Sequence, residues 1–282
     1  MSDERQVYDD QEKLWNGPAG RAWVEAQDVL DGMFQSFEEH LVQAMAAASG
    51  GRVLDVGCGT GSTTLALARR LGPQGRAVGI DLSASVLALA QARAEREGVP
   101  ADFIRADAQA HAFEPASFDR IVSRFGVMFF GDPVRAFANL RRSAKDGAEL
   151  CCIAWRSAAE NPFMTTAEHA AAPLLPQLPV RQPGAPGQFA FADRHRVQAI
   201  LEESGWASID IRPIDVACVL PERDLIRYVS WLGPVGVMLQ QADEPTRSEV
   251  VATVRAAFEP YVGGAEVRFT AACWWVGATA SR

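Results

Sequence analysis

The clearest chemical signal in the chain is a glycine-rich turn, LDVGCGTG, at residues 54–61. It stands between an apolar run and a helical segment, where glycines let the backbone come close to a ligand. The N-terminus of the following helix offers unpaired N–H groups to an anion. Dinucleotide sites use G-x-G-x-x-G, whereas here the third glycine comes one residue early and Ser62 takes the last position. No G-K-[ST] follows, which excludes the nucleotide triphosphate P-loop as a motif.

Three further segments follow the glycine turn in order. Asp81 and Asp107 each close another apolar run, and SRFGVMFF at residues 123–130 stands just before an Asp-Pro pair. Together the four segments resemble the motifs of class I S-adenosylmethionine-dependent methyltransferases of the small-molecule type. Within this class, the motifs resemble those of the ubiquinone/menaquinone-biosynthesis-like branch. The resemblance covers about residues 50–155, and four motifs in the right order are far more specific than the loop alone.

The resemblance implies S-adenosylmethionine as the cofactor and a role for each acidic residue. A carboxylate has two acceptor oxygens and a ribose diol has two donors, so Asp81 suits the ribose. Asp107 is expected to accept from the adenine amino group, and Asp55 to face the methionine ammonium or to hold the loop. Each acid also has a purely structural interpretation, as a strand-end acid, a turn residue or a loop support. The predicted cofactor-binding residues are Asp55, Gly57, Cys58, Gly59, Gly61, Asp81, Leu82, Asp107, Ala108, Arg124, Phe125, Trp15 and Trp23.

Two of these predictions concern the N-terminal segment, which the resemblance implies is a helix that covers the cofactor. The indole of Trp15 or Trp23 can cover the adenosyl or sulfonium end, the latter through a cation–π contact. The alternative is that both tryptophans pack this helix onto the edge of the sheet. The same resemblance implies that the backbone at Arg124 and Phe125 contacts the methionine ammonium.

The sequence assigns no catalytic residue. The sulfonium is already activated, so proximity and orientation supply most of the acceleration, about 7–11 kcal/mol in good cases. A general base is needed only when the acceptor must lose a proton, and His169 and His195 are more typical of surface or packing positions. The five cysteines and four histidines show no metal-ligand spacing. No metal site is therefore predicted.

The acceptor is predicted to be a small, apolar or aromatic metabolite, with O- or C-methylation favoured and N-methylation open. The region beyond the cofactor half is rich in apolar and aromatic residues, which also fit ordinary core packing; they include Phe163, Phe189, Phe191, Trp231, Met238 and Trp274. Two alternatives stay open. One is a protein that keeps the cofactor fold without methyl transfer, such as a cyclase, a decarboxylase or a binding subunit. The less favoured one is an NAD(P)-dependent oxidoreductase.

The elements that must position these residues alternate between strand and helix. Apolar runs predict strands at 52–56, 77–80, 102–106, 118–123 and 149–155, with helices at 62–71, from Ser83 to Gly98, and from 133 to about 147. Residues 30–48 predict an amphipathic helix, and strands are expected at 208–219, bent or interrupted at Pro213, and at 266–278. The fold class is therefore α/β: a Rossmann-like sheet of about seven strands, mostly parallel with the last strand antiparallel. Helices cover both faces, and a helical and loop cap is inserted.

Four parts are predicted along the chain. They are an N-terminal helical lid over 1–50, a cofactor-binding α/β core over 51–155, a proline-rich cap insertion over 156–192, and a C-terminal part of the core sheet over 193–282 with a helical insertion at about 222–260.

Composition narrows the class of protein. The 282 residues carry a formal net charge of −8, which argues against a nucleic-acid partner because phosphates call for a basic face. No apolar stretch reaches the length of a transmembrane helix, and the polar N-terminus lacks a signal-peptide core. We therefore expect a cytoplasmic protein without membrane insertion, whose partner is a small-molecule acceptor. The sequence is compatible with a homo-oligomer but has no feature that predicts the oligomeric state.

Overall fold

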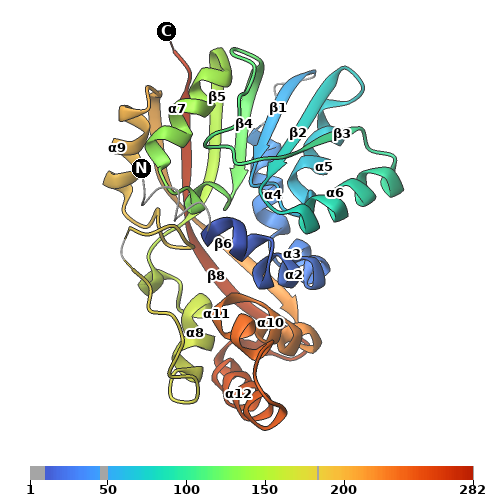
Figure 1. Ribbon diagram of the computed structural model, residues 1–282, viewed down its shortest axis with the longest axis vertical. Helices are drawn as coiled ribbons and strands as arrows, with labels where there is room; N and C mark the ends of the chain where they lie inside the picture. The colour runs from blue at the N-terminus through green and yellow to red at the C-terminus, as the bar shows by residue number, and fades with distance from the viewer. Residues whose placement is uncertain (1–9, 45–49, 183, 282) are drawn as a thin grey trace.

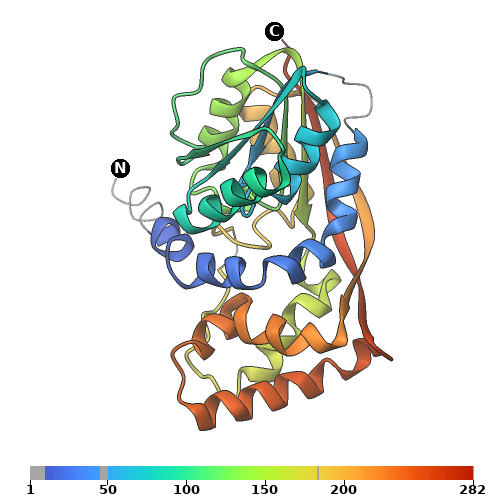
Figure 2. The ribbon, with the colours of Figure 1, turned by 90° about the vertical axis from the view of Figure 1, so that its right-hand side faces the viewer.

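The structure is a computed structural model that describes residues 10–44, 50–182 and 184–281. A sheet covered by helices forms one part of the molecule, and a group of helices lies against one end of it (Figures 1 and 2). Within the described residues, no helix is long and apolar enough to cross a membrane.

The sheet confirms the predicted Rossmann-like fold. Across the described residues, seven strands follow one another in the order β3-β2-β1-β4-β5-β8-β6, while the short β7 pairs only with β8. Strands β1 to β5 pair in parallel, and β8 runs antiparallel to both β5 and β6. The strands are β1 (Gly51–Val56), β2 (Gly75–Asp81), β3 (Ala101–Arg105), β4 (Phe118–Arg124), β5 (Ala144–Trp155), β6 (Ala207–Pro221), β7 (Val262–Gly263) and β8 (Glu266–Thr279).

Helices cover both faces of the sheet. Helices α4 and α5 pack together on one face, and α7 and α9 pack together on the other (Figure 2). The segment at residues 10–15 is also helical. The helices are α2 (Pro18–Glu25), α3 (Gln27–Met33), α4 (Gln35–Ala44), α5 (Ser62–Leu71), α6 (Ala84–Glu97), α7 (Pro133–Ser143), α8 (Pro162–Ala171), α9 (Arg194–Glu203), α10 (Leu225–Trp231), α11 (Gly233–Leu239) and α12 (Glu244–Ala257).

Local sequence chemistry explains where several helices begin. The Asp132 carboxylate accepts from the backbone N–H of Arg135 at 2.9 Å, and Pro133 takes the first turn of α7. Asp193 caps α9 in the same way. Ser83 also stands at the predicted N-cap, of α6, but its hydroxyl faces Ser85 Oγ at 3.2 Å rather than the helix backbone.

Three predicted element boundaries are wrong. The helix predicted over 30–48 is divided at Phe34, because its ring packs against Phe125 and Trp155 where the chain turns from α3 to α4; its last residues lie outside the described part. Helix α7 ends at Ser143 and β5 begins directly after it, since the chain there already pairs with β4 before a bulge. Of the two alternatives at Pro213, the interruption is wrong: β6 pairs with β8 through Pro213, because β6 is the edge strand, where a proline removes no ladder hydrogen bond.

The ends of β6 and β8 extend beyond the parallel strands to a helical unit made of α8, α10, α11 and α12 (Figure 1). These helices come from two separate stretches of the chain, 162–171 and 225–257. Phe163 holds them together, because its ring stacks on Phe269 of β8 with centroids 3.7 Å apart and meets Phe258 edge-on at 5.0 Å. Helix α2 lies between this unit and α6.

Candidate functional site

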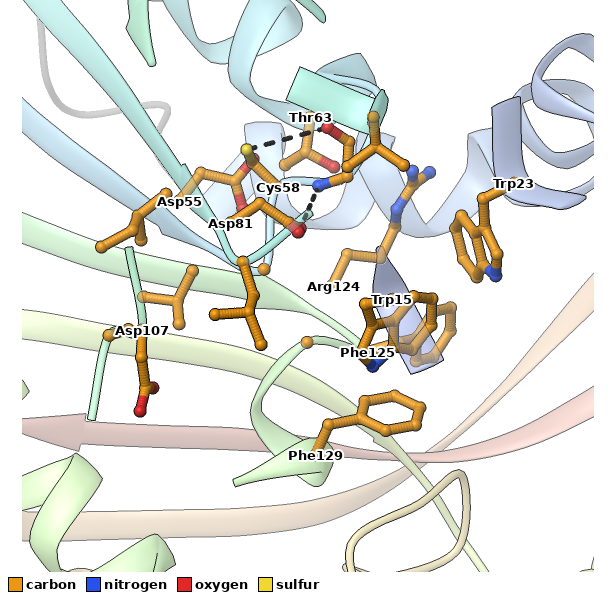
Figure 3. Close-up of a pocket in the computed structure, with 18 of the residues that line it drawn as sticks. Trp15, Trp23, Asp55, Cys58, Thr63, Asp81, Asp107, Arg124, Phe125 and Phe129 are labelled. Carbon is orange, nitrogen blue, oxygen red and sulfur yellow. Dashed lines mark hydrogen bonds between the residues drawn. The ribbon is translucent and has the colours of Figure 1, made fainter. Parts of the chain in front are cut away.

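A cavity of about 140 Å³ opens where the carboxyl ends of β1, β2 and β4 meet. This is where the strand order reverses direction between β1 and β4, the position at which open α/β sheets bind ligands. Figure 3 shows carboxylates on one side of the cavity and aromatic rings on the other. The predicted residues that line it are Trp15, Trp23, Asp55, Gly57, Cys58, Gly59, Asp81, Leu82, Asp107, Ala108, Arg124 and Phe125.

Gly61 is the predicted cofactor residue that does not line the cavity. It begins helix α5 with φ +85°, and an added Cβ would lie 2.9 Å from the Cβ of Ala90 and 3.3 Å from the ring of Phe103. The close packing of α5 against α6 and β3 thus explains why this position is a glycine.

The glycine loop comes close to the loop after β4. Gly57 has φ +68°, and a Cβ there would stand 2.6 Å from the Cα of Gly126. The Ser123 hydroxyl joins the two loops: it donates to the carbonyl of Val56 at 2.7 Å and accepts from the N–H of Gly126 at 3.1 Å. Phe125, between them, has φ +67°. Left-handed backbone at a non-glycine residue is strained and gathers at functional sites.

Asp81 ends β2 and supports the same loop. One carboxylate oxygen accepts from the N–H of Gly59 at 2.9 Å, and the other accepts from the N–H of Ser83 at 2.9 Å. Burial raises the pKa of Asp81, and these backbone hydrogen bonds oppose the rise. Each oxygen keeps a further lone pair, so the carboxylate can accept from a ligand diol as well.

Asp55 is almost fully enclosed, with 2% of its surface exposed. The Thr64 hydroxyl donates to it at 2.7 Å. Burial raises the pKa of Asp55 to about 6, although the Thr64 hydrogen bond and the positive charge of Arg124 lower it. The guanidinium of Arg124 also donates to the backbone oxygen of Phe34 at 3.4 Å. The charge of Asp55 is therefore only partly compensated.

Asp107 lies in the turn after β3. Its carboxylate accepts from the N–H of Gln109 at 2.9 Å, and burial raises its pKa. The neighbouring Ala108 is buried, and its carbonyl accepts from the Asn139 amide at 2.8 Å. The turn is thus held from behind, and Asp107 lines the cavity on the side away from the aromatic rings (Figure 3).

Thr63 is a lining residue that the sequence interpretation missed. Its hydroxyl is buried and has no hydrogen-bond partner among the described residues. A buried orphan hydroxyl is expected to bind a ligand. Its signal in the sequence was weak, because a threonine two residues beyond a glycine loop is as typical of a helix face. With the three carboxylates, it fits a ligand that has a ribose diol, amino groups and a carboxylate, as S-adenosylmethionine does.

An aromatic wall closes the other side of the cavity. We use this name for Trp15, Trp23, Phe125 and Phe129. The ring of Trp15 stands perpendicular to Phe129 with centroids 5.1 Å apart and meets Trp23 edge-on at 6.1 Å. Phe125 stacks on Trp155 at 4.8 Å. The aromatic wall therefore joins the N-terminal segment to the loop after β4.

Behind the aromatic wall lies a second cavity of about 760 Å³, which reaches the helical unit. Both cavities are lined by Gln11 and by the four residues of the aromatic wall. The larger cavity is mostly apolar, and its described lining carries three ionisable groups, Glu168, Arg181 and Tyr228. Glu168 and Arg181 form an ion pair, and the Arg181 guanidinium lies 4.6 Å over the ring of Phe189.

Several other candidates lie away from the cavities. His169 and His195 are exposed and line neither of them. No group of residues in the described part has the arrangement of a metal site. All five cysteines are free; Cys151 is half-buried and the others are buried. Of the aromatic cap residues, Phe163, Phe189, Trp231 and Met238 line the larger cavity, whereas Phe191 and Trp274 do not.

Sequence comparison identifies the domain. A family model described as a methyltransferase domain matches residues 53–147. The demethylmenaquinone methyltransferases of Lactiplantibacillus plantarum and Staphylococcus aureus are each 34% identical to this chain over 125 residues. These matches cover 43% and 42% of this chain, and 52% and 51% of those proteins. The chain thus spans about half the length of the curated relatives it matches.

Solved structures share the fold. The YcgJ protein of Bacillus subtilis superposes with a TM-score of 0.56 at 17% identity, over 87% of this chain and 98% of that one. Phosphoethanolamine N-methyltransferase 2 of Haemonchus contortus, solved with S-adenosyl-L-methionine, superposes with a TM-score of 0.53 at 17% identity. The match covers 86% of this chain and 53% of that one. The cyclase SpnF superposes with a TM-score of 0.51 at 20% identity, and the match covers 86% of this chain and 81% of that one. From its matched motifs and its fold, the chain contains a class I S-adenosylmethionine-dependent methyltransferase domain that is distantly related to the demethylmenaquinone methyltransferases.

Proposed function

We propose that this protein transfers the methyl group of S-adenosylmethionine to an oxygen or carbon atom of a small, apolar or aromatic metabolite. One observation carries the proposal: the smaller cavity, which we call the polar cavity because Asp55, Asp81 and Asp107 line it, adjoins a larger cavity that none of these carboxylates line, and the same aromatic wall lines both. A donor in the first cavity and an acceptor in the second would meet at that wall.

The polar cavity supplies a partner for each part of the cofactor, whose sulfonium provides an activated methyl group. Asp81 accepts from the ribose hydroxyls while its backbone hydrogen bonds hold the loop. Asp107 accepts from the adenine amino group. Asp55 balances the methionine ammonium, and the orphan hydroxyl of Thr63 donates to the methionine carboxylate.

The aromatic wall orients the reacting groups and excludes water. Trp15 and Phe129 pack at right angles to each other, so these two rings of the wall support one another beside the polar cavity. Ring faces attract a cationic sulfonium. Because the methyl group is already activated, holding the acceptor in line accounts for most of the rate acceleration.

The apolar cavity favours acceptors that react without a protein base. Among its described lining residues, Glu168 is the only carboxylate, and it is engaged by Arg181. A carbon nucleophile with electron-rich character, or a hydroxyl acidic enough to ionise by itself, needs no base. This chemistry supports O- or C-methylation of an aromatic or enolic compound.

The test begins with binding and ends with turnover. Calorimetry of the purified protein should show micromolar binding of S-adenosylmethionine and S-adenosylhomocysteine and none of NAD. A screen of apolar phenols and enols should then give a methylated product by mass spectrometry. Failure to bind either cofactor would refute the proposal, and binding of NAD would point to an oxidoreductase.

A second candidate is a protein that uses this fold without methyl transfer. The large apolar cavity and the engaged Glu168 would also suit a cyclase that only encloses its substrate. Binding of S-adenosylmethionine with no methylated product, together with rearrangement or decarboxylation of a bound compound, would favour this candidate.

A further inference from the structure

The larger cavity contains a hydroxyl whose position the proposed function leaves unexplained. Most polar groups of its described lining are already satisfied or lie at its rim: Arg181 and Gln182 are exposed, Glu168 is paired with Arg181, and Gln11 accepts from the Trp15 indole at 3.2 Å. Among the described lining residues, Tyr228 of α10 is the one that carries a hydroxyl.

The hydroxyl of Tyr228 has a poor partner inside the protein. It faces the thioether sulfur of Met164 at 3.6 Å, and a thioether is a weak acceptor. The ring is held in place by Phe163 and Phe258, with centroids at 5.7 and 6.4 Å. Buried hydroxyls are normally well hydrogen-bonded, so a fixed hydroxyl with a weak partner is set to bind a ligand.

The charge state of this hydroxyl defines what it can bind. Burial raises the pKa of Tyr228 well above its ordinary value, and the nearby Cys218 and Glu168 raise it further. The phenol is therefore neutral at physiological pH and donates one hydrogen bond. Its surroundings in the cavity are apolar, which disfavours a ligand that is charged at this point.

We propose that Tyr228 is a specificity residue that donates to a neutral carbonyl or phenolic oxygen of an otherwise apolar acceptor. This inference rests on the proposed function, because it assumes that the larger cavity holds the acceptor. It narrows the substrate class from apolar compounds in general to those that carry an oxygen acceptor on an aromatic or aliphatic ring system.

The test uses two probes of nearly equal shape, 2-acetylnaphthalene and 2-isopropylnaphthalene, of which only the first has a carbonyl. Their dissociation constants are measured by quenching of tryptophan fluorescence, with and without saturating S-adenosylhomocysteine. The variant is Tyr228→Phe. The control is Tyr261→Phe, because Tyr261 packs against the same Phe163 ring at 5.0 Å and does not line the cavity.

We expect the wild-type protein to prefer the ketone by about 5-fold, the size of one net hydrogen bond. Tyr228→Phe should abolish this preference by weakening the ketone alone, and Tyr261→Phe should keep it. Equal binding of both probes to the wild-type protein, or a preference that survives in Tyr228→Phe, would overturn the inference. If S-adenosylhomocysteine fails to bind, the proposed function is refuted, while the probe comparison without it still decides the role of Tyr228.

Discussion

At the scale of single residues, Asp55 carries the clearest energetic consequence. Its pKa is raised from 3.8 to about 6 because the carboxylate is buried. At neutral pH the native state thus holds a poorly solvated charge, which costs about 3 kcal/mol relative to the unfolded chain. The sign follows from the raised value: the stability that Asp55 contributes falls as the pH rises from about 4 to about 6. A bound ammonium group would offset this cost.

Asp55→Asn should therefore stabilise the cofactor-free protein at pH 7.5, by about 1–3 kcal/mol, and should weaken cofactor binding. Thermal unfolding at pH 7.5 and pH 5 measures the effect, and the gain should shrink at the lower pH. Asp119→Asn is the control. Burial raises the pKa of Asp119, but the hydrogen bonds from Lys145 and from the N–H of Arg52, together with the charge of Lys145, outweigh burial and lower the pKa, so this variant should lose stability. A gain of equal size at both pH values would contradict this account of Asp55.

Asp81 gives a second prediction at this scale. Asp81→Ala should raise the dissociation constant of S-adenosylhomocysteine by at least about 100-fold, because two charge-assisted hydrogen bonds are lost and the Gly59 loop loses its support. Calorimetry provides the measurement. Asp119→Ala removes a carboxylate at the opposite end of the parallel strands, and it should leave the constant within 2-fold (about 0.4 kcal/mol). If Asp81→Ala left the dissociation constant of S-adenosylhomocysteine unchanged, Asp81 would not be a cofactor-binding residue.

At the scale of elements, the side chain of Asn16, at a turn, ties the N-terminal segment over residues 10–25 to the connection between β2 and α6. The Asn16 amide donates to the carbonyl of Leu82 at 3.3 Å and accepts from the N–H of Ala84 at 2.9 Å. These hydrogen bonds hold Trp15 of the aromatic wall beside the start of α6. The placement of this wall therefore depends on a contact between residues far apart in the chain.

Asn16→Ala should loosen this segment without unfolding the core. We expect about 5- to 30-fold faster amide exchange over residues 10–25, from the loss of two hydrogen bonds, and a several-fold weaker affinity for S-adenosylhomocysteine. Exchange in β1 and β4 should not change. Gln35→Ala is a matched control, since that amide donates to Glu39 on the same helix and, among the described residues, makes no hydrogen bond to another element. Unaltered exchange over residues 10–25 would show that Asn16 does not anchor the segment.

At the scale of the whole molecule, the shared aromatic wall links the two cavities. A ligand in the polar cavity would complete one side of the apolar cavity, so each ligand should strengthen binding of the other. The helical unit, the N-terminal segment and the sheet all contribute to these walls. Coupling between the cavities is thus a property of the complete chain.

Saturating S-adenosylhomocysteine should lower the dissociation constant of the neutral, apolar fluorescent probe N-phenyl-1-naphthylamine by about 5-fold or more. Titrations followed by probe fluorescence test this. Trp15→Ala should reduce the coupling, whereas Trp274→Ala, which lines neither cavity, should retain it. Displacement of the probe by S-adenosylhomocysteine would mean that the two ligands compete for one cavity.

The difference between what was predictable and what was not has a physical basis at each scale. The alternation of apolar runs and helices predicted the sheet, because strand and helix periodicities are local. Pro213 left a bend or an interruption open, because a strand tolerates proline where it is an edge strand, and only the strand order shows that β6 is one. The division of the 30–48 helix at Phe34 depends on rings contributed by β4 and β5.

The sequence by itself determined the glycine loop and the three carboxylates, because each stands next to its strand end and parallel strands bring those ends to one edge. It also determined the class of cofactor through motifs that are short and ordered. The roles of these residues and the division of the chain into four parts stay predictions. Only the tertiary structure brought together the aromatic wall, the unpartnered hydroxyl of Thr63 and the large cavity that contains Tyr228. The lining of the large cavity alone reaches from Gln11 to Phe258, and no local pattern records contacts between segments so far apart in the chain.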